Sequence, residues 1–388
     1  MSGVGSTSNG RGRTAGSWLL SAVTLLSIAC SASSPSSSST PPPSPTPSSG
    51  SAQQPSPTPP PTLPPAPGPA SQGNFDSVHA AQVLSPTVAL IIVSSSAGTS
   101  EGSGFVIQSQ RGTSYLATNN HVVQGGSKVQ VLMPDGRHYT ASVQGTDVVE
   151  DVAVVKVSDD LPVAQFADSA RAAVGEPVVA IGSPLGSQGF GTVTVGVISA
   201  LHRQLPDVAS SGNRNSEALA DVLQTDAPIN PGNSGGPLGD GNGRVVGMNT
   251  AGSSNATGIG YAIPSRIVQR VSQNLITGKS PGHPYLGVCF LTIEDALAEN
   301  RTVKGYGVLV MGVAAGTPAD HAGIKNGDVL EKVDGIELNN GQTLGGILQL
   351  HNPGDSVKLS VLRGNDAVDL TGTLGDRPAN AATCNSTP

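Results

Sequence analysis

Aromatic and charged side chains are scarce in this sequence. Aromatics make up 3% of its 388 residues, Asp, Glu, Lys and Arg together make up 12%, and the formal net charge is −7. No cluster of Lys and Arg occurs, and since nucleic-acid binding depends on clustered cations that displace counterions, nucleic acid is not an expected partner. The metalloprotease motif His-Glu-x-x-His is also missing. We therefore expect neither nucleic-acid binding nor metal chemistry, and no cofactor.

Cysteine is rare as well, and its three copies are too widely spaced for a zinc knuckle or a redox Cys-x-x-Cys motif. Cys30 follows two arginines and an apolar stretch, residues 18–29, which is too short to cross a membrane and is typical of an export signal. The residues before Cys30 resemble a bacterial lipobox, although Leu26 lies four rather than three positions before the cysteine. We expect residues 1–30 to be a signal peptide with a lipobox. Cys30 would then be lipidated and would anchor the exported protein to the cell membrane on its extracytoplasmic side; an ordinary signal peptide with an incidental cysteine is the alternative.

Glycine and proline, by contrast, are plentiful, with 50 and 31 copies. Residues 31–73 consist almost entirely of Ser, Pro, Thr and Ala. Such a segment cannot bury apolar surface, so we expect a disordered tether, which at ~3.1 Å per residue reaches on the order of 100 Å. A polar tail, residues 377–388, is expected to be disordered too.

Between tether and tail, short β-branched runs separated by turns predict a mainly β protein with two folded regions. Residues 74–278 show no alternation of strands and helices, which favours an all-β domain of one or two barrels. Residues 279–376 mix strands with a helix at 344–351, and Asp334-Gly335 marks a hairpin. Apolar spacing over residues 265–276 predicts an amphipathic helix that joins the two regions.

The run Gly-Asn-Ser-Gly-Gly-Pro at 232–237 places a serine, Ser234, between glycines. A serine hydroxyl becomes a useful nucleophile when a base accepts its proton and backbone donors stabilise the oxyanion. Glycines let the chain turn tightly enough for this, so Gly232, Asn233 and Ser234 form the candidate oxyanion turn, with the N–H groups of Gly232 and Ser234 as its donors. A glycine-rich surface turn without chemistry is the alternative.

His121 is the candidate base among seven histidines, because it follows a strand and enters a short polar turn. An orienting carboxylate should lie between the histidine and the serine in the order His, Asp, Ser. Asp151 begins an apolar strand and would be buried against the imidazole. The other candidates are Asp135, Asp147, Asp159, Asp160 and Asp226.

Three segments that contain these residues, 118–123, 151–157 and 224–238, resemble the catalytic blocks of the HtrA/Deg serine proteases. The resemblance covers about residues 75–375. It implies a chymotrypsin-like double β-barrel followed by a PDZ domain of α+β type, a His121, Asp151 and Ser234 triad, unfolded proteins or peptides as substrates, and a homotrimer. Residues 201–221 and Pro228 depart from the family pattern.

In this fold the floor of the S1 pocket, which holds the side chain before the cleaved bond, lies six residues before the nucleophile, at Pro228. Its walls come from the strand that contains Asn249 and Thr250. No acid lines that path, so we expect cleavage after Val, Ile or Ala rather than after Lys or Arg.

Tyr285, Leu286, Gly287 and Val288 resemble the carboxylate-binding loop of the family's PDZ domains, which predicts peptide binding by strand addition. A small β domain that serves only as a packing partner is the alternative. For the whole chain, the rival hypothesis is a non-catalytic envelope scaffold or chaperone that acts through the PDZ domain.

Overall fold

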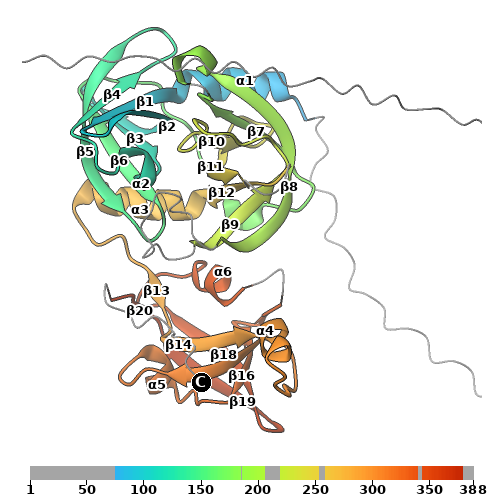
Figure 1. Ribbon diagram of the computed structural model, residues 1–388. Helices are drawn as coiled ribbons and strands as arrows, with labels where there is room; N and C mark the ends of the chain where they lie inside the picture. The colour runs from blue at the N-terminus through green and yellow to red at the C-terminus, as the bar shows by residue number, and fades with distance from the viewer. Residues whose placement is uncertain (1–74, 185, 206–218, 253–257, 340–342, 379–388) are drawn as a thin grey trace, which may run out of the picture. The chain divides into compact units, whose positions relative to one another are not determined.

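The structure is a computed structural model that describes residues 75–184, 186–205, 219–252, 258–339 and 343–378, all within one compact unit of the chain. The described residues form two closed β-barrels followed by a smaller domain of strands and short helices (Figure 1). The predicted mainly β architecture with a double barrel is confirmed.

The first barrel closes in the strand order β1-β2-β3-β6-β5-β4 with antiparallel pairing throughout. Its strands are β1 (Val88–Ser95), β2 (Gly98–Gln110), β3 (Thr113–Thr118), β4 (Lys128–Leu132), β5 (His138–Asp147) and β6 (Val152–Val157). The short helix α2 (Asn120–Val123) follows β3 directly. His121 therefore lies in α2, just after β3, and Asp151 directly precedes β6, and these two strands pair with each other.

The second barrel closes in the order β10-β11-β12-β9-β8-β7. Its strands are β7 (Pro177–Gly182), β8 (Thr192–Leu205), β9 (Leu219–Thr225), β10 (Pro237–Gly239), β11 (Val245–Gly252) and β12 (Gly260–Pro264). Short 3-10 turns occur at Ser85–Thr87, Ser169–Arg171 and Gly186–Gly189. Ser234 lies in the connection between β9 and β10.

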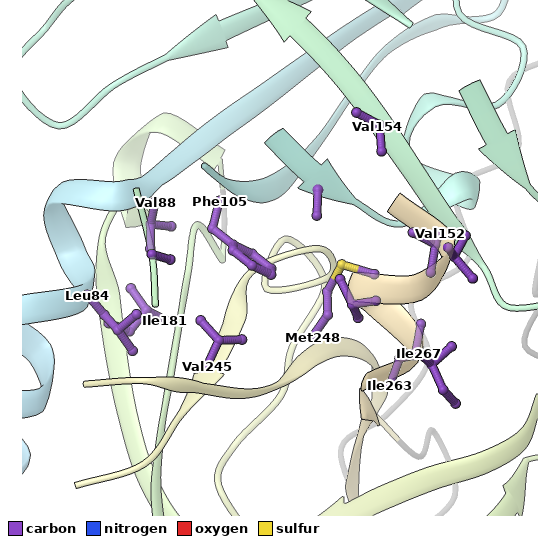
Figure 2. Close-up of a cluster of buried hydrophobic side chains, with 14 of the residues drawn as sticks. Leu84, Val88, Phe105, Val152, Val154, Ile181, Val245, Met248, Ile263 and Ile267 are labelled. Atoms are coloured by element: carbon purple, nitrogen blue, oxygen red, sulfur yellow. The ribbon is translucent and has the colours of Figure 1, made fainter. Parts of the chain in front are cut away.

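The two barrels share a core, and β6 shows how the sequence builds it. Residues 152–155 form an apolar run because alternate side chains face opposite sides of a strand and both sides of β6 are buried here. Ala153 and Val155 face the interior of the first barrel. Val152 and Val154 join a cluster that also contains Met248 of the second barrel. Figure 2 shows side chains from both barrels and from the following helix meeting in this cluster.

Two helices pack on the barrels. α1 (Ser77–Leu84) begins at Asp76, whose carboxylate accepts hydrogen bonds from two N–H groups of the first turn. α3 (Ser265–Thr277) buries Ile267, Val268, Val271 and Leu275 along one face and ends at a glycine with positive φ. The predicted amphipathic helix at 265–276 is confirmed by α3.

The C-terminal domain contains a sheet in the order β14-β15-β16-β18-β19, with β17 paired to β16, and a two-stranded sheet of β13 and β20. These strands are β13 (Pro284–Tyr285), β14 (Val288–Thr292), β15 (Val308–Val313), β16 (Val329–Val333), β17 (Ile336–Glu337), β18 (Ser356–Arg363), β19 (Asp366–Thr373) and β20 (Gly375–Asp376). The helices are α4 (Ile293–Ala298), α5 (Pro318–Ala322) and α6 (Leu344–Leu348). Among the described residues β14 pairs only with β15, so β14 is an edge strand.

Two local predictions for this domain can be compared with the structure. Asp334 and Gly335 both have positive φ, 48° and 81°, and they connect β16 to β17, so the predicted hairpin is confirmed. The helix expected over residues 344–351 ends earlier, at Leu348. The chain continues in a turn instead, because the N–H groups of Leu350 and His351 bond three residues back, to the carbonyls of Ile347 and Leu348, and not four residues back as in an α-helix.

Candidate active site

His121 and Asp151 are joined by two hydrogen bonds. Nδ1 of His121 lies 2.8 Å from Oδ2 of Asp151, and the N–H of His121 donates to Oδ1 at 3.0 Å. Because a carboxylate accepts and cannot donate, the ring proton of the neutral imidazole resides on Nδ1. Nε2 is then the ring atom that can accept a proton.

Asp151 is itself held firmly. Its side chain is 9% exposed, and Oδ2 accepts a second hydrogen bond from Oγ1 of Thr250 at 2.9 Å. The Asp151 carbonyl accepts from Nδ2 of Asn119 at 3.0 Å and from the N–H of Asn120 at 3.1 Å. These bonds maintain a φ of 51° at Asp151, a left-handed conformation that Asp tolerates better than most residues do.

Ser234 reaches the same neighbourhood from the second barrel. Its hydroxyl donates to the carbonyl of Thr250 at 2.9 Å. No hydrogen bond joins Ser234 to His121 in the described part of the chain. Rotation about the Cα–Cβ bond, which separates staggered rotamers, is the movement that would turn the Ser234 hydroxyl from Thr250 towards the imidazole.

The backbone around Ser234 limits which N–H groups can bind an oxyanion. The N–H of Asn233 donates to the carbonyl of Asn230 at 2.9 Å and is therefore occupied. The carbonyl of Asn233 accepts from Gly236 N at 2.9 Å, so the N–H of Ser234, on the other side of the same planar peptide, points the opposite way. Of the three residues in the predicted oxyanion turn, Gly232 and Ser234 therefore remain as candidate N–H donors, and Asn233 does not.

Two glycines of this loop cannot be replaced by a residue with a side chain. Gly232 has φ 101°, and a Cβ there would lie 2.2 Å from the Ser183 carbonyl oxygen. Gly235 has φ 86°, and its Cβ would lie 2.1 Å from the Ser103 carbonyl oxygen. The loop therefore packs backbone against backbone on both barrels.

The three residues expected at the S1 pocket differ in exposure. Pro228 is exposed. Asn249 is buried and donates from Nδ2 to the carbonyl of Pro237, and Thr250 is buried with its side chain on Asp151. The side chains of Asn249 and Thr250 are therefore occupied elsewhere, and only the backbone of these two residues is left to line an S1 pocket.

The alternative carboxylates lie elsewhere. Asp147 accepts from Nε2 of His283 at 2.8 Å, and Asp226 accepts from the N–H of Val197 at 2.7 Å. Asp135 and Asp159 both contact Arg137 on the surface. None of these four carboxylates bonds to His121 within the described residues.

A buried acid, Glu150, directly precedes Asp151. It is 1% exposed; Oε1 accepts from Nε2 of Gln349 at 2.7 Å, and Oε2 has no hydrogen-bond partner. Burial and, after it, the charge of Asp147 raise the pKa of Glu150 to about 7. Burial, the largest single effect, would lower the pKa of His283, but the hydrogen bond to Asp147 together with the charges of Asp147, Glu150 and Asp376 outweighs burial and raises this pKa. A group that titrates near neutral pH, Glu150, therefore directly precedes the candidate catalytic carboxylate in the chain.

The predicted carboxylate-binding loop connects β13 to the edge strand β14. Tyr285 is half-buried in β13, and Leu286 is buried in the domain core, its carbonyl accepting from Ala319 N at 2.8 Å. Gly287 has φ 87°, and a Cβ there would lie 2.4 Å from Cβ of Thr317. Val288 begins β14. The loop is thus fixed at the start of a strand whose outer edge is unpaired among the described residues.

Sequence reasoning missed Ser103 and the role of Thr250. Ser103 is buried in β2 and donates from Oγ to the carbonyl of Gly232 at 2.6 Å. The only local signal was its place between two glycines, Gly102 and Gly104. Thr250 was expected to line a pocket, and instead it contacts both Asp151 and Ser234.

Several predictions concern residues outside those that the structure describes: Cys30, the tether and most of the unusual loop at 201–221. Among the described residues, no helix has the length and apolar character needed to span a membrane. In the same part of the chain, no three His, Cys, Asp or Glu side chains cluster as metal ligands would. Cys289 is disulfide-bonded, and the other two cysteines, Cys30 and Cys384, are not among the described residues.

Comparison with known proteins adds independent information. Residues 102–248 match the trypsin-like peptidase domain, and residues 284–374 match the PDZ domain. HhoA of Synechocystis sp. is 41% identical over 283 residues, which are 70% of this chain and 69% of HhoA. A Chlamydia trachomatis protein, whose name describes a periplasmic DegP-like serine endoprotease, is 38% identical over 282 residues, 71% of this chain and 54% of its own length.

Among solved structures, the HtrA-type protease AlgW with a tripeptide superposes with a TM-score of 0.59 at 34% identity, covering 78% of this chain and 97% of AlgW. The chain belongs to the HtrA/DegP family of serine proteases, with one trypsin-like peptidase domain and one PDZ domain.

Proposed function

We propose that this chain is an exported serine endopeptidase that cleaves unfolded or misfolded proteins through an acyl-enzyme, with His121, Asp151 and Ser234 as its catalytic residues. The observation that carries this assignment is the double contact of Thr250, whose side chain bonds to Asp151 and whose carbonyl bonds to Ser234. This contact brings the serine hydroxyl next to the Asp–His pair although they belong to different barrels.

The geometry supports the following reaction. Oγ of Ser234 attacks the peptide carbonyl carbon while its proton passes to Nε2 of His121. The resulting oxyanion accepts hydrogen bonds from the N–H groups of Gly232 and Ser234. His121 then returns the proton to the leaving amine as the C–N bond breaks and the acyl-enzyme forms. A water molecule then attacks the carbonyl carbon of the acyl-enzyme while its proton passes to Nε2 of His121. His121 returns this proton to Oγ of Ser234 as the ester bond breaks, which releases the carboxylic acid product. Asp151 stays ionised and stabilises the imidazolium.

A fluorophosphonate probe tests this proposal, because it reacts with an activated serine and not with an ordinary one. Wild type should label and should digest casein, whereas Ser234→Ala should do neither and should keep the wild-type circular dichroism spectrum. A chain that acts only as an envelope scaffold or chaperone would remain unlabelled, and that result would overturn the catalytic assignment.

The S1 pocket is proposed to accept small or medium aliphatic side chains. Pro228 supplies an exposed apolar surface, and Asp226, two residues before it, accepts a hydrogen bond from the N–H of Val197 through Oδ1. A peptide library should show cleavage after Val, Ile or Ala. A dominant preference for Arg would contradict this assignment.

The PDZ domain is proposed to bind peptide C-termini along β14. The fixed loop at Gly287 and the open edge of β14 support this role, and the related structure AlgW contains a tripeptide. Fluorescence polarisation should show binding of a peptide with a free, apolar C-terminus and much weaker binding of the same peptide with an amidated end. Equal affinities would exclude recognition of a carboxylate.

Export and anchoring through lipidated Cys30 are proposed from the sequence, and a relative with a periplasmic name supports an extracytoplasmic location. Wild type expressed in a bacterial host should partition into detergent, and Cys30→Ala should be released in soluble form. A mature N-terminus sequenced downstream of Cys30 would rule lipidation out.

A homotrimer is proposed as the assembly, and an exposed apolar surface supports it. Val78 of α1 is 64% exposed, and Val193 and Val195 of β8 are 37% and 49% exposed. Together with Pro86 they line a shallow hollow of about 500 Å³. Apolar patches on soluble proteins commonly mark protein contacts, so this surface is the candidate subunit contact.

A further inference from the structure

We propose that Ser103 is a positioning residue that holds the Ser234 loop in the shape that presents its oxyanion-binding N–H groups. The proposal rests on the assignment of Ser234 as the nucleophile. Ser103 lies in β2 of the first barrel, is fully buried, and touches neither His121 nor Asp151 through any described hydrogen bond.

Ser103 makes hydrogen bonds to two loop residues and to the second barrel. Its hydroxyl donates to the carbonyl of Gly232 at 2.6 Å and accepts from the N–H of Ser183 at 3.0 Å. Its own N–H donates to the carbonyl of Ser234 at 2.8 Å. Ser183 directly follows β7. One hydroxyl therefore ties the first barrel, the second barrel and the candidate nucleophile loop together.

These bonds fix the orientation of whole peptide groups, because a peptide is planar. The carbonyl of Gly232 and the N–H of Asn233 belong to one peptide, held by Ser103 on one side and by the Asn230 carbonyl on the other. If this peptide turned over, the neighbouring N–H groups would turn with it. The hydrogen bond from the Ser103 hydroxyl thus keeps the turn that contains both oxyanion donors in one conformation.

The peptide after Ser234 is held in the same way. Its carbonyl accepts from Ser103 N, and its N–H, which belongs to Gly235, donates to the carbonyl of Asn249 at 2.8 Å. With the peptides on both sides fixed, the peptide between Asn233 and Ser234, whose carbonyl accepts from Gly236 N, is held in one orientation as well. Ser103 acts on both flanking peptides, through its side chain on one and through its backbone on the other.

The glycines beside Ser103 explain how β2 comes so close to the loop. A Cβ at Gly102 would lie 2.7 Å from Cγ1 of Val122 and 3.4 Å from the Ser234 carbonyl oxygen. A Cβ at Gly104 would lie 3.0 Å from the carbonyl oxygen of Ala117. Side chains at either position would push β2 away from α2 and β3, and the Ser103 hydroxyl would then no longer lie within hydrogen-bond distance of the Gly232 carbonyl.

Ser103→Ala removes the hydroxyl and leaves the backbone bond to Ser234. The Gly232 carbonyl would then retain the Ser183 N–H, which lies 3.3 Å away. Loss of a direct oxyanion donor costs ~10²–10³ in kcat. Because Ser103 acts on the donors indirectly, we expect kcat to fall by ~10- to 100-fold with KM changed by less than about threefold.

The matched control is Ser114→Ala. Ser114 is also fully buried in the first barrel, and its hydroxyl bonds to the carbonyl of Asp159 at 2.7 Å, among residues that take no part in the site. Both variants lose buried hydrogen bonds, so both lose stability. Only Ser103→Ala should lose kcat, and only Ser103→Ala should bind a peptide boronate more weakly, because the boronate adduct of Ser234 places an oxygen at the oxyanion donors.

The experiment measures kcat, KM and boronate affinity for wild type, Ser103→Ala, Ser114→Ala and Ser234→Ala. A kcat for Ser103→Ala within twofold of wild type, or a loss that Ser114→Ala shares, overturns the role of Ser103. If Ser103→Ala does not fold, Ser103→Cys decides, since a thiol keeps the volume but is a weak donor and acceptor. Its kcat should still fall, and a wild-type value overturns the proposal. Full activity of Ser234→Ala would instead overturn the proposed function itself.

Discussion

Thr250 accepts a hydrogen bond from the hydroxyl of Ser234 through its carbonyl, at 2.9 Å. Through its side chain the same residue donates to Asp151, also at 2.9 Å. Thr250 thus connects the candidate nucleophile to the acid of the Asp–His pair across the two barrels. In this arrangement the Ser234 hydroxyl donates to a carbonyl and not to the proposed base, so the proposed reaction would begin with a rotation of the Ser234 side chain.

Asp151→Asn should lower kcat by ~10⁴-fold, because an amide stabilises neither the Nδ1 tautomer nor the imidazolium. Asp147→Asn is the matched control, since Asp147 is also buried and bonds to His283 instead. Its kcat should stay within a few-fold of wild type. Casein digestion and probe labelling measure the activity of both variants. A larger loss of activity in Asp147→Asn than in Asp151→Asn would identify Asp147, and not Asp151, as the catalytic carboxylate.

Thr250→Val should lower kcat by about 10- to 100-fold, since it removes one hydrogen bond to a charged group and keeps the Thr250 carbonyl. Thr250→Ser keeps the hydroxyl and should stay close to wild type. Steady-state kinetics with a peptide substrate distinguishes the two variants. Equal activities would show that the Thr250 hydroxyl does not support Asp151.

Glu150 should make stability depend on pH. Its pKa rises from 4.5 in the unfolded chain to about 7 in the folded chain, so the folded chain binds more protons between these values. Stability therefore falls as the pH rises from about 4.5 through about 7, by on the order of 3 kcal/mol. The raised pKa of His283 acts in the same direction.

Glu150→Gln should remove most of this pH dependence and should be more stable than wild type at pH 8. Urea unfolding of the protein at several pH values measures the difference, and Glu294→Gln on the exposed surface of α4 is the control. A gap between wild type and Glu150→Gln that stays constant from pH 5 to pH 8 would show that Glu150 does not titrate in this range.

The disulfide of Cys289 should join it to Cys384. Lipidation would leave Cys30 without a thiol, and β20, which pairs with β13, brings the chain near the domain's own first strands just before the tail. In the chain-entropy model, closing this loop of 95 residues stabilises by about 4.7 kcal/mol. Peptide mapping without reduction should recover Cys289 linked to Cys384, and Cys384→Ser should lower the melting temperature of the PDZ domain. Recovery of Cys289 linked to Cys30 would contradict both this bridge and lipidation.

Val195→Asp should convert the proposed trimer into monomers, because it places a charge on the exposed apolar surface formed with Val78 and Val193. Light scattering after gel filtration measures the mass. Leu297→Asp, at a residue 58% exposed in α4, is the control and should leave the mass unchanged. A Val195→Asp protein that keeps the wild-type mass would place the subunit contact elsewhere.

The sequence by itself determined the fold class and the residues whose chemistry is local. Ser234 was recognisable because glycines flank it, and the positive φ values of Gly232 and Gly235 show why glycine is required there. Asp151 was preferred over the other acids because it begins an apolar strand, and that strand, β6, pairs with the strand that leads to His121. Strand periodicity and turn residues act over a few positions, so they can be read along the chain.

Only the tertiary structure decided the contacts that join distant segments. Ser103 meets Gly232 across 129 positions, Thr250 meets Asp151 across 99, and Gln349 meets Glu150 across 199. No local pattern specifies such pairs, because a buried serine, threonine or glutamate has the same neighbours in sequence whether it supports a site or fills a core. Packing of the two barrels places Ser103 and Thr250 within hydrogen-bond distance of their partners, and Gln349 of the C-terminal domain reaches Glu150 of the first barrel. Burial then raises the pKa of Glu150.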